Sequence, residues 1–250
     1  MKCLSIDRLP VQPPKLSYMS DVLIVAATFT ETAFITGKSK KQYRQNLFNV
    51  IKGSDFTADL LITGPGIHAT SYHLGRQLFA KKYELCINIG ICGSLDPEIT
   101  PVKLVHVTTD TFGDFGVDNK GVFMDVFEAG LYRRNEFPFR DGRLKPQAIK
   151  GLQSIKAITP VNGITVQKVT GSKKNARELA VKYGPCTESM EGAAFFYACM
   201  QSEVNCLQVR SVSNMVEERN KKKWKIKGAV DALEGITGLL LSELRAGKKN

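Results

Sequence analysis

Short runs of consecutive apolar residues recur along this chain, and they constrain its fold more than any other feature. Residues 21–27 have the sequence DVLIVAA, and similar runs occupy residues 58–63, 85–89 and 102–107. A run of this length without polar alternation predicts a strand that is buried on both faces of a sheet. Three later segments also have strand character, namely residues 163–169, 186–190 and 205–212.

Segments with helical periodicity separate these runs. They are residues 68–82 (with Leu74, Leu78 and Phe79 as apolar positions), 147–156, 173–182, 192–201 and 228–245. Strands that alternate with helices predict an α/β fold of three layers, in which helices flank a twisted, mostly parallel (mixed) central sheet. Residues 113–146 combine glycine, proline and aromatic residues, and we expect long loops there.

The 250 residues of the chain are enough for one domain with a substantial core. We expect a single domain over residues 21–246, preceded by a flexible N-terminal extension (1–20) and followed by a basic tail (247–250). The proline-rich start lacks the apolar stretch of a signal peptide, and no apolar run approaches the roughly 20 residues that cross a membrane. The six cysteines show no CxxC spacing, which predicts buried free thiols, a cytoplasmic location and no metal site.

The net charge of +11 suggests a nucleic-acid partner until its location along the chain is considered. Residues 219–227 and 244–250 together contain nine basic residues and no acid, so the rest of the chain is nearly neutral. Because the sequence lacks the signatures of RNA- and DNA-binding modules, we expect neither a nucleic acid nor a membrane as partner. A nucleic-acid-binding protein that uses residues 219–227 stays open as the non-enzyme alternative.

Small residues or single polar residues follow each predicted strand, at the edge where parallel sheets bind their ligands. These positions are Thr28 to Glu31, Gly64 to Gly66, Gly90 to Ser94, Thr170 to Ser172, Glu191 with Gly192, and Ser213 with Asn214. We expect the carboxylates of Glu31 and Glu191 to converge on one cleft. No GxGxxG motif follows the first strand, and the sequence has no P-loop and no GxSxG motif, which excludes the common dinucleotide, P-loop and α/β-hydrolase sites.

Four motifs occur in the order and spacing of the nucleoside phosphorylase/nucleosidase family, which the chain resembles over about residues 21–246. The motifs are ATFTE at 27–31, NIGICG at 88–93, ESMEGAA at 188–194 and VRSVSN at 209–214. The resemblance implies a nucleoside phosphorylase-like fold and cleavage of the N-ribosidic bond of a small-molecule nucleoside, with no cofactor. It also implies a homodimer or higher homo-oligomer, in which a loop of a neighbouring subunit completes the pocket.

The same resemblance assigns catalytic roles to Glu31, Glu191 and Asn214. Glu31 would be the general base that orients and deprotonates a water molecule. Glu191 would accept hydrogen bonds from the ribose 2′- and 3′-hydroxyls above an apolar floor formed by Met190, and Arg210 would pair with Glu191 or its neighbours. The other candidate substrate-binding residues are Thr28, Phe29, Ile91, Cys92, Gly93, Val169, Ser213 and Trp224.

Two asparagines depart from the family pattern and indicate which reaction to expect. Phosphorylases carry arginine at the position of Asn88, and an amide cannot neutralise a phosphate dianion, so we expect water as the nucleophile. Adenine-specific nucleosidases carry aspartate at the position of Asn214, whereas the two N–H donors of asparagine suit N7 and the oxygen of a 6-oxopurine. A methylthioadenosine/adenosylhomocysteine nucleosidase and a purine nucleoside phosphorylase are the alternative enzymes.

The pocket walls are also expected from the resemblance. Residues 91–93 would line the base and the water, with Cys92 as a packed thiol rather than a nucleophile. Trp224, the only tryptophan, would close the 5′ side of the ribose. An acidic group on the 5′ arm would need a cation, and Arg219, the lysines of 221–225 and Arg133 are all candidates.

Overall fold

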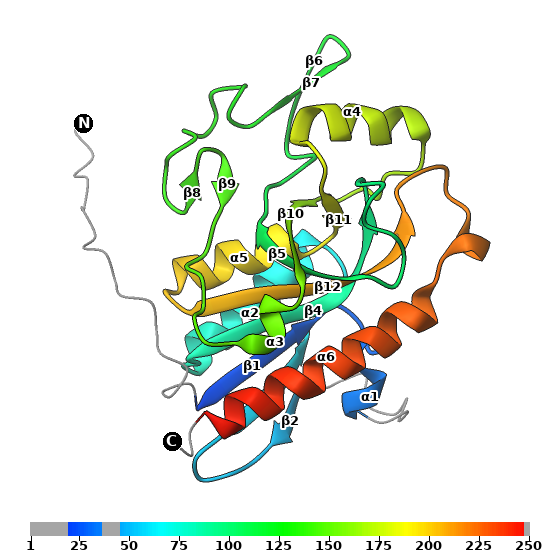
Figure 1. The fold of residues 1–250 in the computed structure, drawn as a ribbon. Helices are drawn as coiled ribbons and strands as arrows, with labels where there is room; N and C mark the ends of the chain where they lie inside the picture. The colour runs from blue at the N-terminus through cyan, green and yellow to red at the C-terminus, as the bar shows by residue number, and fades with distance from the viewer. Residues whose placement is uncertain (1–19, 37–45, 248–250) are drawn as a thin grey trace, which may run out of the picture.

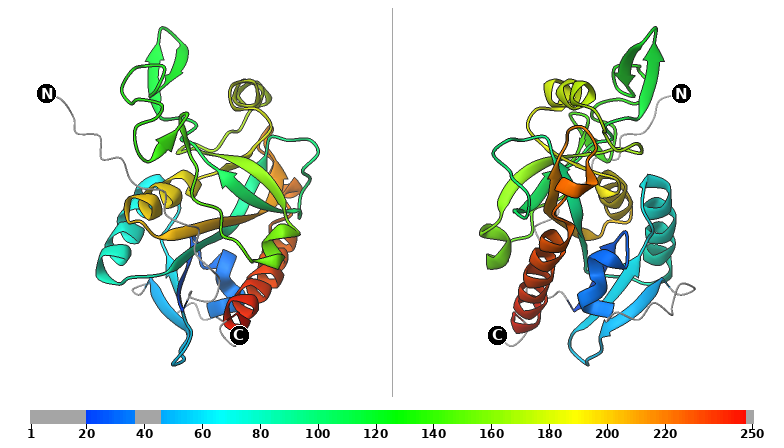
Figure 2. Two further views of the ribbon diagram at one scale, coloured as in Figure 1. Left: turned by 60° about the vertical axis from the view of Figure 1, so that its left-hand side comes forward. Right: turned by 90° about the vertical axis from the view of Figure 1, so that its right-hand side faces the viewer.

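The computed structural model describes residues 20–36 and 46–247 of the protein. Residues 1–19 and 248–250, which make up most of the expected N-terminal extension and C-terminal tail, lie outside the described residues. The described chain forms three layers, with helices on both faces of a central sheet (Figures 1 and 2).

The central sheet has eight strands in the order β11-β10-β5-β12-β4-β1-β3-β2. Its strands are β1 (Asp21–Ala26), β2 (Leu47–Ile51), β3 (Thr57–Ile62), β4 (Leu85–Ser94), β5 (Leu104–Thr109), β10 (Thr159–Thr165), β11 (Thr187–Ser189) and β12 (Asn205–Met215). Most neighbouring strands are parallel, whereas the pairs β2–β3, β5–β12 and β11–β4 are antiparallel. The predicted α/β fold with a mixed, mostly parallel sheet is therefore confirmed.

Four long helices flank the sheet: α2 (Ile67–Ala80), α4 (Lys173–Tyr183), α5 (Gly192–Gln201) and α6 (Ile226–Ala246). Short helical segments are η2 (Thr30–Thr32), α1 (Ala33–Thr36), α3 (Gln153–Lys156) and η3 (Lys221–Lys223). Helices α2 and α5 pack against each other on one face of the sheet, and α6 lies across the opposite face (Figure 1).

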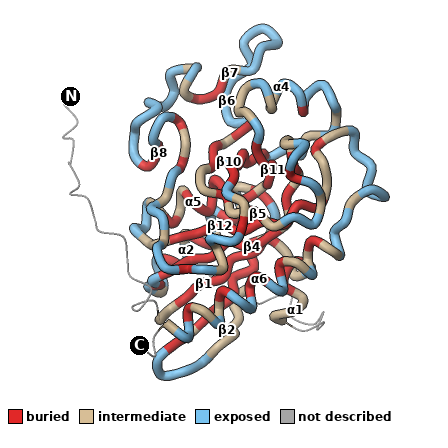
Figure 3. The backbone as a smooth tube through the Cα atoms, in the orientation of Figure 1, coloured by how far each residue is buried: buried red, intermediate tan, exposed pale blue. Residues whose placement is uncertain are grey.

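The side chains of β1 show why its apolar run has no polar alternation. Leu23 and Val25 point into the core layer under α2 and α5, and Val22 and Ile24 point into the layer under α6. Because successive residues of a strand face opposite sides of the sheet, a strand covered on both sides must be apolar throughout. Figure 3 shows this burial along the central strands.

Two strands run further than the sequence predicts. The glycines at 90 and 93 were expected in a turn after a strand over residues 85–89, but β4 continues to Ser94 and β12 continues to Met215. The two strands stay paired throughout, with Gly90 opposite Arg210 and Gly93 opposite Asn214. Backbone pairing over this length outweighs the turn preference of glycine, which places candidate residues on rigid strands rather than on loops.

Other expectations also need correction. The strand expected at 163–169 is β10, which ends at Thr165, and the helix expected over 147–156 is reduced to α3. Residues 113–146 contain two small hairpins, β6 (Gly116–Asn119) with β7 (Val122–Asp125) and β8 (Phe139–Arg140) with β9 (Arg143–Leu144), in place of loops alone. Phe79 is 95% exposed, because the buried stripe of α2 follows Leu74 and Leu78 and the next residue is rotated about 100° away.

The five cysteines in the described part of the chain are free and buried. None of the helices in the described ranges is long and apolar enough to cross a membrane.

Candidate functional site

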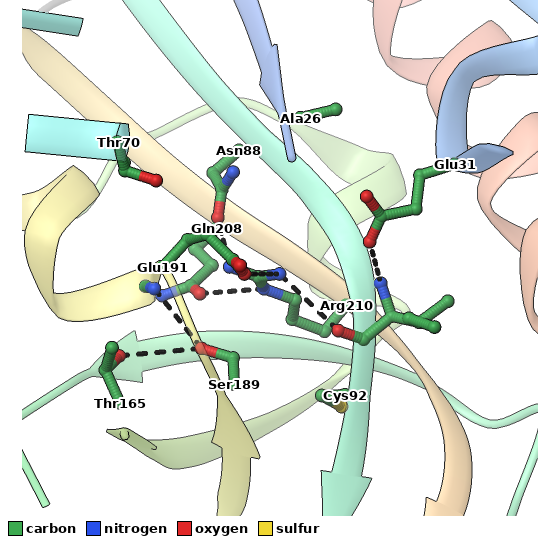
Figure 4. A network of polar contacts seen from close by, with 12 residues as sticks. Ala26, Glu31, Thr70, Asn88, Cys92, Thr165, Ser189, Glu191, Gln208 and Arg210 are labelled. Atoms are coloured by element: carbon green, nitrogen blue, oxygen red, sulfur yellow. Dashed lines mark hydrogen bonds and ion pairs between the residues drawn. The ribbon is translucent and has the colours of Figure 1, made fainter. Parts of the chain in front are cut away.

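The neighbouring strands β1, β4 and β12 bring the main candidate residues together at their carboxyl ends (Figure 4). Glu31 lies in η2, the next element after β1, and Arg210 lies on β12. Glu191 joins them from the connection between β11 and α5. The two carboxylates therefore converge around one arginine, although they are 160 positions apart in the chain.

Three donors hold the buried Glu31 carboxylate. Oε2 accepts hydrogen bonds from the N–H and the Oγ1 of Thr28, each at 2.9 Å, and Oε1 accepts one from the N–H of Ile91 at 3.0 Å. Burial, and next the charge of Glu191, raise the pKa of Glu31, while the Ile91 hydrogen bond and Arg210 act in the opposite direction. A fixed carboxylate whose pKa is raised suits a general base.

Glu191 is held from two sides at the start of α5. Its Oε1 accepts the N–H of Gly66 at 3.0 Å, and its Oε2 pairs with Nη1 of Arg210 at 3.4 Å. Gly66 adopts a positive φ of 96°, which glycine tolerates best and which turns its N–H toward the carboxylate. Gly66 thus has a role at the site, although the sequence indicated only a turn at residues 64–66.

Arg210 is 1% exposed, and its guanidinium is bound on several sides. Nε donates to Oε1 of Gln208 at 2.9 Å, and Nη2 donates to Oδ1 of Asn88. Neither role was predicted from the sequence, but the spacing offered a signal for Gln208, because residues two apart on a strand share a face. Asn88 also donates to the carbonyl of Val25 at 2.9 Å, so this amide serves to orient Arg210.

Gly90 allows Glu31 and Arg210 to approach the same stretch of β4. A Cβ atom at this position would lie 2.9 Å from Oε1 of Glu31 and 2.5 Å from Nη1 of Arg210. A side chain would push the two charged groups apart. The glycine is therefore required by the site and not by a turn.

Asn214 lines a small cavity of about 120 Å³. Its Oδ1 accepts from Oγ of Ser213 at 2.7 Å, and its Nδ2 donates to the carbonyl of Met215 at 2.9 Å. One of the two amide N–H groups is thus engaged with the backbone in this arrangement, and the other remains for a purine. Thr170 and Trp224 line the same cavity.

Cys92 is buried next to the site, and the half-buried Phe29 packs against the core. The carbonyl of Cys92 can accept a hydrogen bond from Ser213 at 3.1 Å, and burial raises the pKa of its thiol to about 12. A thiol with so high a pKa is not a nucleophile at neutral pH. Phe29 packs edge-on against Phe48, with ring centroids 5.7 Å apart.

Two candidate residues remain, Val169 and Met190. Val169 is 39% exposed, and its loop contributes Thr170 rather than Val169 to the lining of the 120 Å³ cavity. Met190 is partly buried directly before Glu191.

Two of the candidate cations line the cavity that holds Trp224. The Arg219 guanidinium lies 5.7 Å from the centre of the Trp224 ring, and Lys223 pairs with Glu217 at 3.4 Å. Arg133 belongs to the distant loop between β7 and β8, outside the lining of this cavity. Arg219 is thus the better placed of the candidate arginines.

Comparisons with known proteins identify the family and the fold of the chain. A family model described as the phosphorylase superfamily matches residues 21–240. A futalosine hydrolase of Thermus thermophilus is 27% identical over 224 residues, which cover 88% of this chain and 95% of that protein. The native structure of a futalosine hydrolase of Helicobacter pylori has a TM-score of 0.71 at 13% identity and covers 90% of this chain and 98% of its own.

A 5′-methylthioadenosine/S-adenosylhomocysteine nucleosidase of Colwellia psychrerythraea, solved in complex with adenine, is similar to the same extent. Its TM-score is 0.69 at 15% identity, with 91% of this chain and 97% of that chain covered. At these identities the two solved structures establish the shared fold.

Proposed function

Because the chain belongs to the phosphorylase superfamily, we propose that it hydrolyses the N-ribosidic bond of futalosine and releases hypoxanthine and dehypoxanthine futalosine. The observation that carries the proposal is the buried Glu31 carboxylate beside the Glu191–Arg210 ion pair. One carboxylate is available as a base, and the other is held in place by a cation. This division suits a reaction that needs both a proton acceptor and a sugar-binding group.

In the proposed reaction, Glu31 takes a proton from a water molecule as the oxygen of that water attacks C1′. The bond between C1′ and N9 breaks, its electron pair leaves with the purine, and the purine takes up one proton from solvent to become hypoxanthine. Glu31 then returns its proton to solvent, so the reaction adds one water molecule in total. The raised pKa of Glu31 makes it a stronger proton acceptor than an ordinary carboxylate. The three hydrogen bonds from Thr28 and Ile91 fix its orientation before the substrate arrives.

Glu191 is proposed to accept the ribose 2′- and 3′-hydroxyls and to stabilise the positive charge that develops on the sugar. The Gly66 N–H and Arg210 already position its two oxygens. Met190 is proposed to lie under the sugar.

Water is the proposed nucleophile because the residue at position 88 cannot bind phosphate. Asn88 is uncharged, 1% exposed and engaged with both Val25 and Arg210. An anion of charge −2 needs charged, bidentate donors. This arrangement disfavours the alternative of a purine nucleoside phosphorylase.

The base is proposed to bind beside Asn214, between residues 91–93 and Ser213. An amide N–H donates well to the oxygen of a 6-oxopurine and opposes the amino group of adenine. This preference favours futalosine over methylthioadenosine. Phe29, Val169 and Trp224 are proposed to complete the apolar walls, and Arg219 to meet the carboxylate on the 5′ arm.

The cellular location, the oligomeric state and the pathway are proposed from the same family resemblance. The domain over residues 21–246 would act as a cytoplasmic homodimer or higher oligomer, and the reaction would belong to menaquinone biosynthesis.

A panel of matched nucleosides tests the choice of substrate. We expect the kcat/KM for base release to be highest with futalosine, lower with its 6-amino analogue and lower again with inosine, which lacks the acidic arm. Base release is measured by chromatography. Faster release of adenine from methylthioadenosine than of hypoxanthine from futalosine would reject the proposal.

A further inference from the structure

Asp110 is a buried carboxylate close to the site, and the proposed reaction does not use it. It directly follows β5, is 1% exposed, and exchanges two backbone hydrogen bonds with Leu144 that fix its main chain. Its Oδ2 accepts from Nε2 of Gln208 at 3.2 Å, and its Oδ1 accepts from Oγ1 of Thr165 at 3.0 Å. Each of these two hydrogen bonds begins a path to the Glu191–Arg210 pair.

The first path runs through Gln208 to Arg210. An amide side chain has one donor group and one acceptor, so donation to Asp110 turns the oxygen of Gln208 away from it. That oxygen accepts Nε–H of Arg210 at 2.9 Å. The negative charge of Asp110 thus determines which end of Gln208 faces the guanidinium.

The second path runs through Thr165 to the start of α5. A hydroxyl has one hydrogen, and that of Thr165 is donated to Asp110, so its oxygen is left to act as acceptor. It accepts the N–H of Ala193 at 2.7 Å, two residues after Glu191. Ser189, whose hydroxyl oxygen lies 3.5 Å from that of Thr165, accepts the N–H of Gly192 at 3.2 Å in the same turn (Figure 4).

Because Gly163 and Gly192 have no side chains, there is room beside them for the carboxylate of Asp110. A Cβ atom at Gly192 would lie 2.2 Å from Oδ2 of Asp110 and 2.3 Å from Oε1 of Gln208, and one at Gly163 would lie 2.8 Å from Oδ2. The residue that follows Glu191 therefore packs directly on the Asp110–Gln208 pair. Any shift of this pair is passed to the turn that carries Glu191.

Asp110 is ionised at neutral pH despite its burial. Burial raises its pKa to about 6, while the hydrogen bonds from Gln208 and Thr165 and the charge of Arg210 limit the rise. At pH 7 the carboxylate form therefore predominates, and it accepts from both donors.

From these contacts we infer that Asp110 is a positioning residue, which sets Arg210 through Gln208 and the turn bearing Glu191 through Thr165. Asp110 touches no reacting atom. Its catalytic effect rests on the proposed function, whereas its effect on Arg210 does not.

Asp110→Asn tests this inference because it keeps the shape and removes one acceptor. The new amide group faces either Gln208, which sets donor against donor, or Thr165, whose hydroxyl must then turn its hydrogen away toward Ser189 in order to accept. If Gln208 turns over in response, its Nε2 faces Nε of Arg210, again donor against donor. We expect kcat to fall about 10- to 100-fold with KM little changed, because a displacement near 1 Å can cost that much.

The double variant Asp110→Asn with Gln208→Glu is the rescue. The amide at position 110 donates to the new carboxylate at position 208, which still accepts from Arg210, so the total charge and the pattern of donors are restored. We expect most of kcat to return. Asp59→Asn is the matched control: this buried carboxylate of β3 accepts from Asn49, Lys81 and Tyr83, and its loss should lower stability and leave kcat unchanged.

A spectroscopic readout keeps the test independent of activity. The Nε–H signal of Arg210, identified by ¹H–¹⁵N NMR through Arg210→Lys, should shift in Asp110→Asn and return in the double variant.

If Asp110→Asn does not fold, Thr165→Val cuts the second path alone and should lower kcat. Wild-type kcat and an unmoved Arg210 signal in folded Asp110→Asn would overturn the inference, as would a folded double variant without recovery. A wild-type protein that releases no base from any nucleoside rejects the proposed function instead, and the Arg210 signal still decides the inference.

Discussion

Replacing Glu31 with glutamine is expected to lower kcat by about 10²- to 10⁴-fold, the usual contribution of a general base. Glutamine has nearly the same shape, but its amide cannot accept a proton from water. The variant should remain folded, because a neutral side chain avoids the burial cost that raises the pKa of Glu31. Hypoxanthine release measures the loss, and thermal unfolding confirms that the fold is intact.

The pH profile of the wild-type protein reports on the same carboxylate. Because the base must be ionised, kcat/KM should fall as the pH drops through the pKa of Glu31, at a higher pH than the ordinary value of about 4.3. Glu243→Gln is the matched control, since Glu243 accepts from Gln153 and Ser154 away from the site and should leave kcat unchanged. A Glu31→Gln variant with nearly wild-type kcat would remove Glu31 from the mechanism.

Replacing Asn214 with aspartate is expected to shift the base preference from hypoxanthine toward adenine by about 100-fold. A protonated aspartate can donate to N7 and accept from the 6-amino group, whereas asparagine offers an N–H where adenine also has one. The ratio of kcat/KM for futalosine and its 6-amino analogue measures the shift directly, because the two substrates share every other group.

Asn220→Asp controls for the added charge. Asn220 lines the same cavity, and its side chain caps η3 by accepting the N–H of Lys222 at 3.1 Å. We expect it to change KM for both substrates alike and to leave their ratio as in the wild type. An unchanged ratio in Asn214→Asp would show that the base is recognised elsewhere.

The apolar runs and the motifs were enough to predict much of the fold and the residues at the centre of the candidate site. The strand β1 and the helix α5 lie within a residue of their expected bounds, because each is buried and apolar over most of its length. The motif around Glu191 placed it at the start of a helix, where the structure has it. Such features are local, and local sequence is enough to predict them.

Features that depend on contacts between residues far apart in the sequence could not be predicted from local sequence. The strand β2 has no buried residue, with four half-buried residues and an exposed Asn49, so it lacks the continuous apolar run that marked its neighbours. Gly90 resembles a turn glycine until Arg210 is seen opposite it. Asp110 resembles any polar residue after a strand, and its link to Arg210 through Gln208 joins two segments, the end of β5 and β12, that only the folded sheet brings together.

The identity of the nucleophile tests the proposed reaction most directly. Wild-type protein is incubated with futalosine in phosphate-free buffer made with ¹⁸O-labelled water, and both products are analysed by mass spectrometry. Hydrolysis predicts that hypoxanthine and the free sugar appear in equal amounts and that the sugar carries one ¹⁸O atom at C1′. Base release that requires added phosphate and yields a sugar 1-phosphate would contradict it.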